Sequence, residues 1–184
     1  YPRTGLGAEP SVHASAACSF VGADRPCTLG LSPGFWRRNT GLWASAFGTG
    51  QEFDAVFQLT NGRKVFDNAT LEDVITLAVD PVDSFLDFLS EDVGNGNAES
   101  AAAQVRVLGF QAVAALQNAA TAVPYALLPS GTSPSGEQGV IPQVNDALQS
   151  GVIGEIKRLK DKFDRLNNAS SPDEEERLKQ LLGG

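Results

Sequence analysis

The sequence has few of the residue types on which metal sites and most acid–base catalysts depend. Its 184 residues contain no methionine, one histidine and two cysteines. The single His13 excludes metal sites built from several histidines and most histidine-based acid–base catalysis. No apolar run approaches the roughly 18 residues that a membrane-spanning helix requires. Neither a Gly-x-Ser-x-Gly turn nor a Walker-type phosphate loop is present. The sequence therefore predicts no enzyme, no metal and no cofactor.

Positive charge is also scarce. Fourteen lysines and arginines stand against 22 aspartates and glutamates, which gives a net charge of −8 and a pI near 4.6. Nucleic acids bind proteins through neutralisation of their phosphates, so an acidic chain is a poor candidate for that partner. The length and the 42% hydrophobic content are those of one folded domain with tails.

Two features favour an extracellular, oxidising location. The chain starts at Tyr1 without a methionine, from which we expect a removed secretory signal peptide, with trimming of the chain as the alternative. Cys18 and Cys27 lie nine positions apart across turn-forming residues, a spacing that suits one short-loop disulfide. Two buried free thiols are the alternative, and zinc would require four ligands. We expect a secreted protein with a Cys18–Cys27 bond.

The first 31 residues follow a strand pattern. Between Ser11 and Phe20 the chain alternates, and small or apolar side chains occupy every second position, which predicts a half-buried strand. These positions are Val12, Ala14, Ala16, Cys18 and Phe20. Turn-forming residues follow, and Cys27–Leu31 is predicted to return antiparallel as the second strand of a hairpin.

From residue 40 onward the patterns are helical. Helices are predicted over about 52–59, 70–78, 80–94, 98–123, 142–150, 155–167 and 171–182. Thr70 and Ser171 open sequences typical of a capping box, and Asp80-Pro81 resembles a helix start. The Ala-rich stretch 98–123 is the expected central helix, with a stripe that includes Val113 and Leu116. The predicted fold is mainly α: a helical bundle (32–169), an N-terminal β-strand and hairpin arm (1–31) and a C-terminal capping helix (170–184).

Several short motifs occur in an order that resembles a known family. The matching stretches are Gly34-Phe35-Trp36-Arg37-Arg38-Asn39 with Trp43, the run Ala112–Ala120 with Tyr125, Leu159-Lys160-Asp161, and Leu166-Asn167-Asn168. The chain from Cys27 to about Ala169 resembles secreted bacterial proteins whose hallmark is a Gly-Tyr-Trp-Lys-Asn-His motif. That family has no established activity, so the resemblance implies an extracellular or cell-surface location.

The chain departs from the family pattern at two places. Thr40 follows Asn39 where the family has histidine, and Ser170-Ser171 stands where the family has a closing cysteine. A metal or catalytic role attached to that histidine is therefore not carried over.

The aromatic and basic residues of the motif allow two interpretations. Exposed tryptophans beside arginines stack sugars or form cation–π contacts, whereas buried ones anchor a segment against helices, which is the reading we favour. The residues concerned are Phe35, Trp36, Arg37, Arg38 and Trp43.

Charge is distributed unevenly along the chain. Residues 51–100 carry eleven acidic side chains against Arg63 and Lys64. Calcium is one interpretation, but the spacing does not fit an EF-hand, and several of these acids stand where helix N-termini favour negative charge. The predicted helix 155–167 carries basic residues on its polar face, either as a solvated face or as a patch complementary to another copy. These are Lys157, Arg158, Lys160, Lys162 and Arg165.

Together these observations favour a secreted structural protein that assembles with copies of itself into a filament or matrix. The expected contacts are made by the N-terminal arm and by the basic helix. The alternative is a monomeric cell-surface module that binds carbohydrate through exposed tryptophans.

Overall fold

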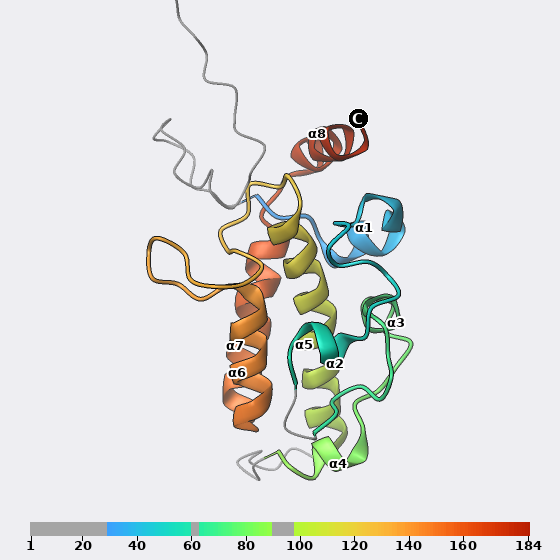
Figure 1. Cartoon of the computed structure of the whole chain (residues 1–184), viewed down its shortest axis with the longest axis vertical. Helices are drawn as coiled ribbons and strands as arrows, with labels where there is room; N and C mark the ends of the chain where they lie inside the picture. Colours follow the sequence, from blue (N-terminus) through green and yellow to red (C-terminus); the bar gives the residue numbers. More distant parts are fainter. Residues whose placement is uncertain (1–28, 60–62, 90–97) are drawn as a thin grey trace, which may run out of the picture.

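The structure, a computed structural model, describes residues 29–59, 63–89 and 98–184. It is mainly helical, with 57% of the described residues in helices, which confirms that the fold is mainly α (Figure 1). The described part contains no sheet, only isolated bridges between Glu52 and Thr70 and between Thr132 and Gln138. The predicted arm, including Cys18, Cys27 and the alternating residues Val12 to Phe20, lies outside the described residues.

Eight α-helices and one 3₁₀-helix, η2, occur in the described ranges. They are α1 (Pro33–Arg38), η2 (Thr40–Leu42), α2 (Phe53–Val56), α3 (Leu71–Ile75), α4 (Asp83–Leu86), α5 (Ala98–Ala120), α6 (Val140–Ser150), α7 (Ile153–Asn167) and α8 (Pro172–Gly183).

Helix α5 is the centre of the fold, as its apolar stripe predicts. It packs along its length against α7, and it also contacts α6 and, on another side, α1, α3 and α4. The stripe is confirmed, because its side chains are completely buried in a single hydrophobic core. They are Val105, Leu108, Ala112, Val113 and Leu116. One core therefore organises the body, and the short helices wrap around α5 (Figure 1).

Both predicted capping boxes are present. Thr70 accepts a hydrogen bond from the amide of Asp73, whose carboxylate accepts one from the amide of Thr70, and α3 starts there. Ser171 and Glu174 make the same reciprocal pair at the start of α8, with Pro172 in the first turn. These local signals act within one turn of chain, so they are readable before the tertiary structure is known.

The helices expected in the acidic half are shorter than predicted. The helix expected over 52–59 is the single turn α2, since Gln58 has a φ of 56°, and α3 is followed by Leu77 with a φ of 59°. Asp80-Pro81 does not start a helix, because α4 begins at Asp83 with Val82 as its N-cap. Left-handed residues follow α2 and α3 and end these two helices after about one turn.

The predicted second hairpin strand is wrong for Leu29–Leu31, which are irregular. Helix α1 follows directly, and the sequence analysis missed it. Its signal is Ser32, whose side chain accepts from the amide of Phe35, followed by Pro33 in the first turn. None of the helices in the described ranges combines the length and apolar character needed to cross a membrane.

Candidate functional site

The most elaborate polar arrangement in the described structure is a set of buried amide side chains where α1, α5 and α7 meet. We call it the amide cluster: Gln111, Gln117, Asn118 and Asn167, all at most 5% exposed. Buried amides are costly unless they are hydrogen-bonded. Their partners therefore show what the cluster does.

Asn118 of α5 binds the chain segment that precedes and forms α1. Its Oδ1 accepts hydrogen bonds from the amide of Leu31 (2.9 Å) and from Nε1 of Trp36 (3.1 Å). Its Nδ2 donates to the carbonyl of Leu31 (2.9 Å) and to Oδ1 of Asn167 (3.1 Å). One side chain thus satisfies both backbone groups of Leu31 and the indole of Trp36.

Asn167 extends the cluster to the end of α7. Its Oδ1 also accepts from the hydroxyl of Tyr125 (2.8 Å), and its Nδ2 donates to the carbonyl (2.9 Å) and the side-chain oxygen (2.8 Å) of Gln111. Gln111 in turn donates to Asp164 of α7 (2.9 Å). Burial raises the pKa of Tyr125 far above its ordinary value, so the phenol stays a donor.

Gln117 fixes the segment after η2. Its Oε1 accepts from the amide of Ala44 (2.9 Å), and its Nε2 donates to the carbonyl of Phe47 (2.8 Å). Nε1 of Trp43 donates to the carbonyl of Trp36 (3.0 Å). Residues 31–47 are therefore hydrogen-bonded to α5 at four successive points, at Leu31, Trp36, Ala44 and Phe47.

The start of the described chain is clamped against the end of α7. Gly30 donates to Oγ of Ser170 (3.1 Å), and its carbonyl accepts from the amide of Ser170 (3.3 Å). A Cβ at Gly30 would lie 1.9 Å from the carbonyl oxygen of Leu166, so only glycine fits this approach. The backbone groups of Gly30 and Leu31 are thus all used within the body.

These contacts bring together the residues that carried the family resemblance. Trp36, Asn118, Tyr125 and Asn167 come from four separate stretches and meet in one hydrogen-bonded cluster. The cluster is internal and fully paired. Its geometry therefore holds the segment 29–47 in place, and it offers no reacting group to a substrate.

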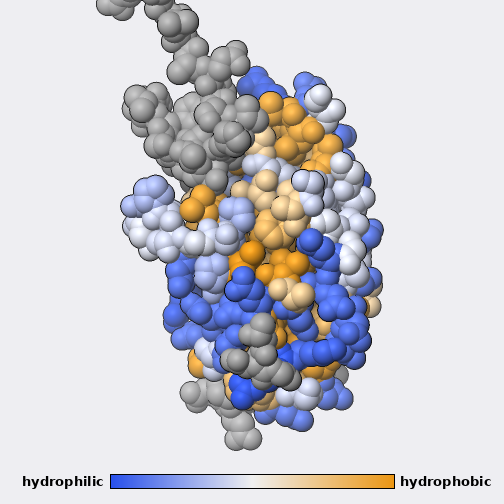
Figure 2. Space-filling model, viewed as in Figure 1, coloured by the Kyte–Doolittle hydropathy of each residue, from blue (hydrophilic) through white to orange (hydrophobic). Residues whose placement is uncertain are grey.

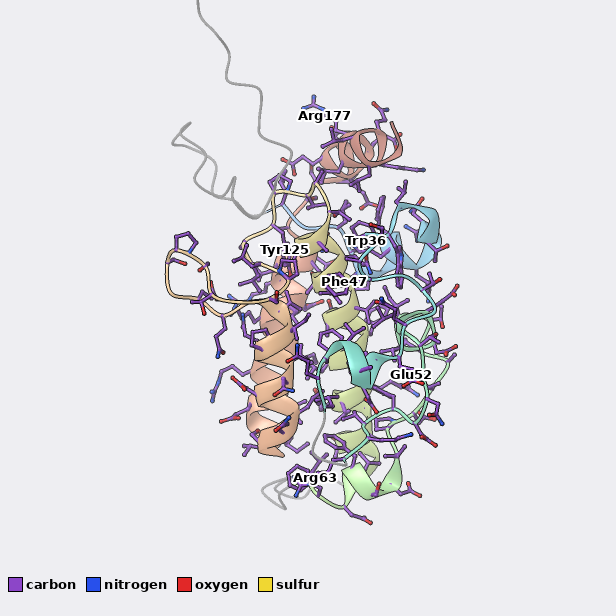
Figure 3. All side chains as sticks on the ribbon, in the orientation of Figure 1. Trp36, Phe47, Glu52, Arg63, Tyr125 and Arg177 are labelled. Carbon is purple, nitrogen blue, oxygen red and sulfur yellow. The ribbon has the colours of Figure 1, made fainter. Side chains whose placement is uncertain are left out.

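The carbohydrate alternative loses its main residue here. Trp36 is 0% exposed and packs edge-to-face on Phe35, with ring centroids 5.2 Å apart, so neither face of the indole is open to a sugar. Trp43 is half-buried, and Arg37 and Arg38 are exposed on α1. Figure 3 places Trp36 between α1 and α5, in the interior of the molecule.

The acidic half uses several of its carboxylates for its own fold. Asp54 accepts from the amides of Val65 (3.1 Å) and Phe66 (3.3 Å), while its burial raises the carboxyl pKa. The hydrogen bonds from Thr70 lower the pKa of Asp73. Within the described ranges, no three acidic, histidine or cysteine side chains gather as metal ligands would.

The five predicted basic residues do lie on α7, but they differ in what they contact. Lys160 binds Oε1 of Gln104 (3.0 Å), and Lys162 binds Oε1 of Glu137 (2.5 Å) and Oε1 of Gln143 (2.7 Å). Lys157, Arg158 and Arg165 are exposed. The outward-facing patch is therefore smaller than the sequence suggests.

Hollows on the described part of the chain range from a water-sized space to two open grooves. The space enclosed by Leu59, Arg63, Val65, Phe85, Leu148 and Gln149 has a volume of about 20 Å³, enough for one water. Open grooves run between α6 and α7 and between α1 and α8, and both are lined mainly by polar and charged side chains. The two grooves measure about 450 and 460 Å³ and are open to solvent, so a ligand bound there would stay partly exposed.

No protein-family model matches the chain, and no curated protein or solved structure matches it either.

The four amides of the cluster were not predicted as a group. The available signal was the placement of polar amides on a helix that is otherwise Ala-rich and apolar. Gln111 and Asn118 are seven residues apart, so they share one face of α5. Their hydrogen-bond partners lie up to 87 residues away, which no local pattern encodes.

Proposed function

We propose that this protein is a secreted structural subunit that assembles with copies of itself through its first 28 residues into an extracellular filament or matrix. The observation that carries the proposal is the clamp at Gly30 and Leu31. It fixes where the N-terminal segment leaves the body. Because the backbone groups of Gly30 and Leu31 are hydrogen-bonded within the body, these residues are not available to pair with the predicted arm strand in a hairpin.

Without Gly30 and Leu31, the predicted arm strand has fewer backbone hydrogen-bond partners within its own chain. Both backbone groups of Gly30 bind Ser170, and both of Leu31 bind Asn118. A strand whose amides and carbonyls lack partners is unstable alone and is normally covered or paired. Contact with another copy would cover the apolar arm residues Val12, Ala14, Ala16 and Phe20.

The length of the arm supports contact between molecules. Twenty extended residues reach about 66 Å, while a body of about 150 residues has a radius of gyration near 15 Å. An arm anchored at Gly30 therefore reaches well past its own body. The proposed Cys18–Cys27 disulfide would fix the base of this arm in an oxidising compartment.

Charge on the body supports association in a fixed orientation. The acidic α2–α4 half and the basic α7 pack on different sides of α5. Exposed Lys157, Arg158 and Arg165 on one copy would face acidic side chains of the next. Such complementary patches set register and encounter rate more than affinity.

The polymer test compares the full chain with a chain that lacks Tyr1–Ala16. We expect light scattering and negative-stain microscopy to show assemblies of the full chain, and the truncated chain to stay folded as a monomer. A full chain that remains monomeric at high concentration, or a truncation that assembles normally, would overturn the proposal.

The disulfide is tested separately by peptide mapping without reductant. A peptide in which Cys18 is joined to Cys27 is the expected product. Free thiols at both positions would remove this part of the proposal.

A further inference from the structure

Apolar side chains of α8 and of the segment after η2 lie together on the described structure, and one of them is largely exposed. Leu178, Leu181 and Leu182 share one face of α8 by their spacing. Leu178 is buried, Leu182 is half-buried and Leu181 is 55% exposed. The end of α8 lies against Leu42, whose Cδ2 is 3.8 Å from the position of a Cβ on Gly183.

This apolar surface continues from α8 onto the main body. Figure 2 shows orange and pale orange surface over α8 at the top and down to the centre of the view, where Figure 3 labels Phe47. We call this the acceptor surface and define it by five residues. They are Leu42, Trp43, Phe47 and Leu182, which are half-buried against the core, and Leu181, which is 55% exposed.

We infer that the acceptor surface receives the apolar side of the N-terminal arm of a neighbouring copy; this inference rests on the proposed self-assembly. The described body has no sheet edge to which a strand could be added. An arm strand must therefore dock there by side-chain packing. Its apolar side chains at every second position require an apolar surface.

The place and size of the surface fit the arm. Residues 1–28 leave the body at Gly30, which is hydrogen-bonded to Ser170, the second residue before α8. The arm's exit and the acceptor surface thus lie at the same end of the molecule. The alternating positions from Val12 to Phe20 span about 26 Å when extended, while the twelve residues of α8 span about 18 Å. The arm is therefore long enough to cross α8 and reach the segment after η2.

The first test is a single exposed substitution. Leu181→Gln removes the most exposed apolar side chain of the surface and keeps a good helix former. We expect the concentration at which the full chain assembles to rise about fivefold to tenfold. Val152→Gln is the matched control, because Val152 is 38% exposed and lies before α7. Equal effects of the two substitutions would overturn the inference.

The second test separates the donor from the acceptor. The chain that lacks Tyr1–Ala16 keeps the acceptor surface, and the double variant Phe47→Gln with Leu181→Gln keeps the arm. Circular dichroism establishes first that both are folded. Each should be monomeric alone, and an equal mixture should form a one-to-one complex in analytical ultracentrifugation.

The outcomes distinguish failure of the acceptor surface from failure of the proposed self-assembly. If the full chain does not assemble, self-assembly itself fails. If the full chain assembles and the double variant assembles equally well, the arm docks elsewhere and only the acceptor surface is overturned. Trp43 provides an independent readout, because its fluorescence should shift to shorter wavelength in the mixture. An unchanged spectrum in a formed complex would contradict docking at this surface.

Discussion

Segment 29–47 and helix α8 lie at the same end of the molecule, but they are held by different means. The first contains only the short helices α1 and η2, and Asn118 and Gln117 bind its backbone through buried or partly buried hydrogen bonds. The second is a regular twelve-residue helix that buries one side chain, Leu178. Regular secondary structure is therefore a poor guide to which part of this end belongs to the core.

The difference follows from what each contact costs to break. Opening segment 29–47 would leave several buried polar groups without partners, each at a cost of about 1–3 kcal/mol. Lifting α8 exposes mainly one leucine, while its backbone hydrogen bonds stay within the helix. We therefore expect the segment to open only with the whole body and α8 to open by itself.

The largest effect is expected for Asn118→Ala. It leaves the amide and carbonyl of Leu31 and the indole of Trp36 without partners, so the free energy of unfolding should fall by at least about 3 kcal/mol. Urea denaturation measures this loss. Asn168→Ala is the control, because Asn168 is exposed and binds only Asp164, and it should change stability by less than about 0.5 kcal/mol. Similar losses in both variants would contradict the role of the amide cluster.

Gly30→Ala tests the clamp without removing a polar group. The added methyl meets the carbonyl oxygen of Leu166 at 1.9 Å, so the chain must shift, at a cost of about 1–3 kcal/mol. Gly41→Ala is matched, since nothing lies within 4 Å of its Cβ position. Thermal unfolding should separate the two, and a Gly30→Ala protein as stable as Gly41→Ala would show that the clamp is loose.

Tyr125→Phe removes one bond of the amide cluster and should cost about 1 kcal/mol, because Asn167 keeps its other partners. Its pH dependence sharpens the prediction. Burial raises the pKa of Tyr125 above its ordinary value of 10.0. Stability should be constant below that value and fall above it, as the unfolded chain alone loses the proton. Urea denaturation from pH 7 to 11 should show a weaker fall in the Phe variant. Parallel curves would contradict a buried phenol.

The two capping boxes give the smallest and most direct comparison of core and edge. Thr70→Ala should lower the stability of the body by about 1 kcal/mol, because α3 buries Leu71, Val74 and Ile75. Ser171→Ala should loosen α8 by a similar amount and leave the main unfolding transition nearly unchanged. Equal shifts of that transition in both variants would show that α8 unfolds with the core.

The parts of the fold that local chemistry determines could be predicted from the sequence. The capping boxes at Thr70 and Ser171 act over three residues, and the stripe from Val105 to Leu116 needs only the helical period. Helix boundaries from α5 to α7 accordingly fall within three residues of the expected ones. The acidic half was harder, since left-handed residues such as Gln58 and Leu77 carry no local marker.

For the candidate site, the sequence indicated some of the residues but not the contacts between them. The tryptophans and Asn167 stood out in the sequence, and the motif suggested that they belong together. Trp36, Leu31 and Asn167 meet at Asn118 through contacts across 49 to 87 residues, which require the fold itself. The basic residues of α7 were placed correctly on one helix. Lys160 and Lys162 bind within the body, because Gln104, Glu137 and Gln143 are brought beside them by the tertiary structure.

Native-state hydrogen exchange tests the contrast between segment 29–47 and α8 most directly. In the monomeric chain without Tyr1–Ala16, the amides of Leu31 and Trp36 should exchange as slowly as those of buried α5 residues such as Val113. The amides of Leu178 and Leu182 in α8 should exchange at least a hundredfold faster, through local opening. Exchange of the α8 amides at the rate of Leu31, or rapid exchange at Leu31 itself, would contradict the account.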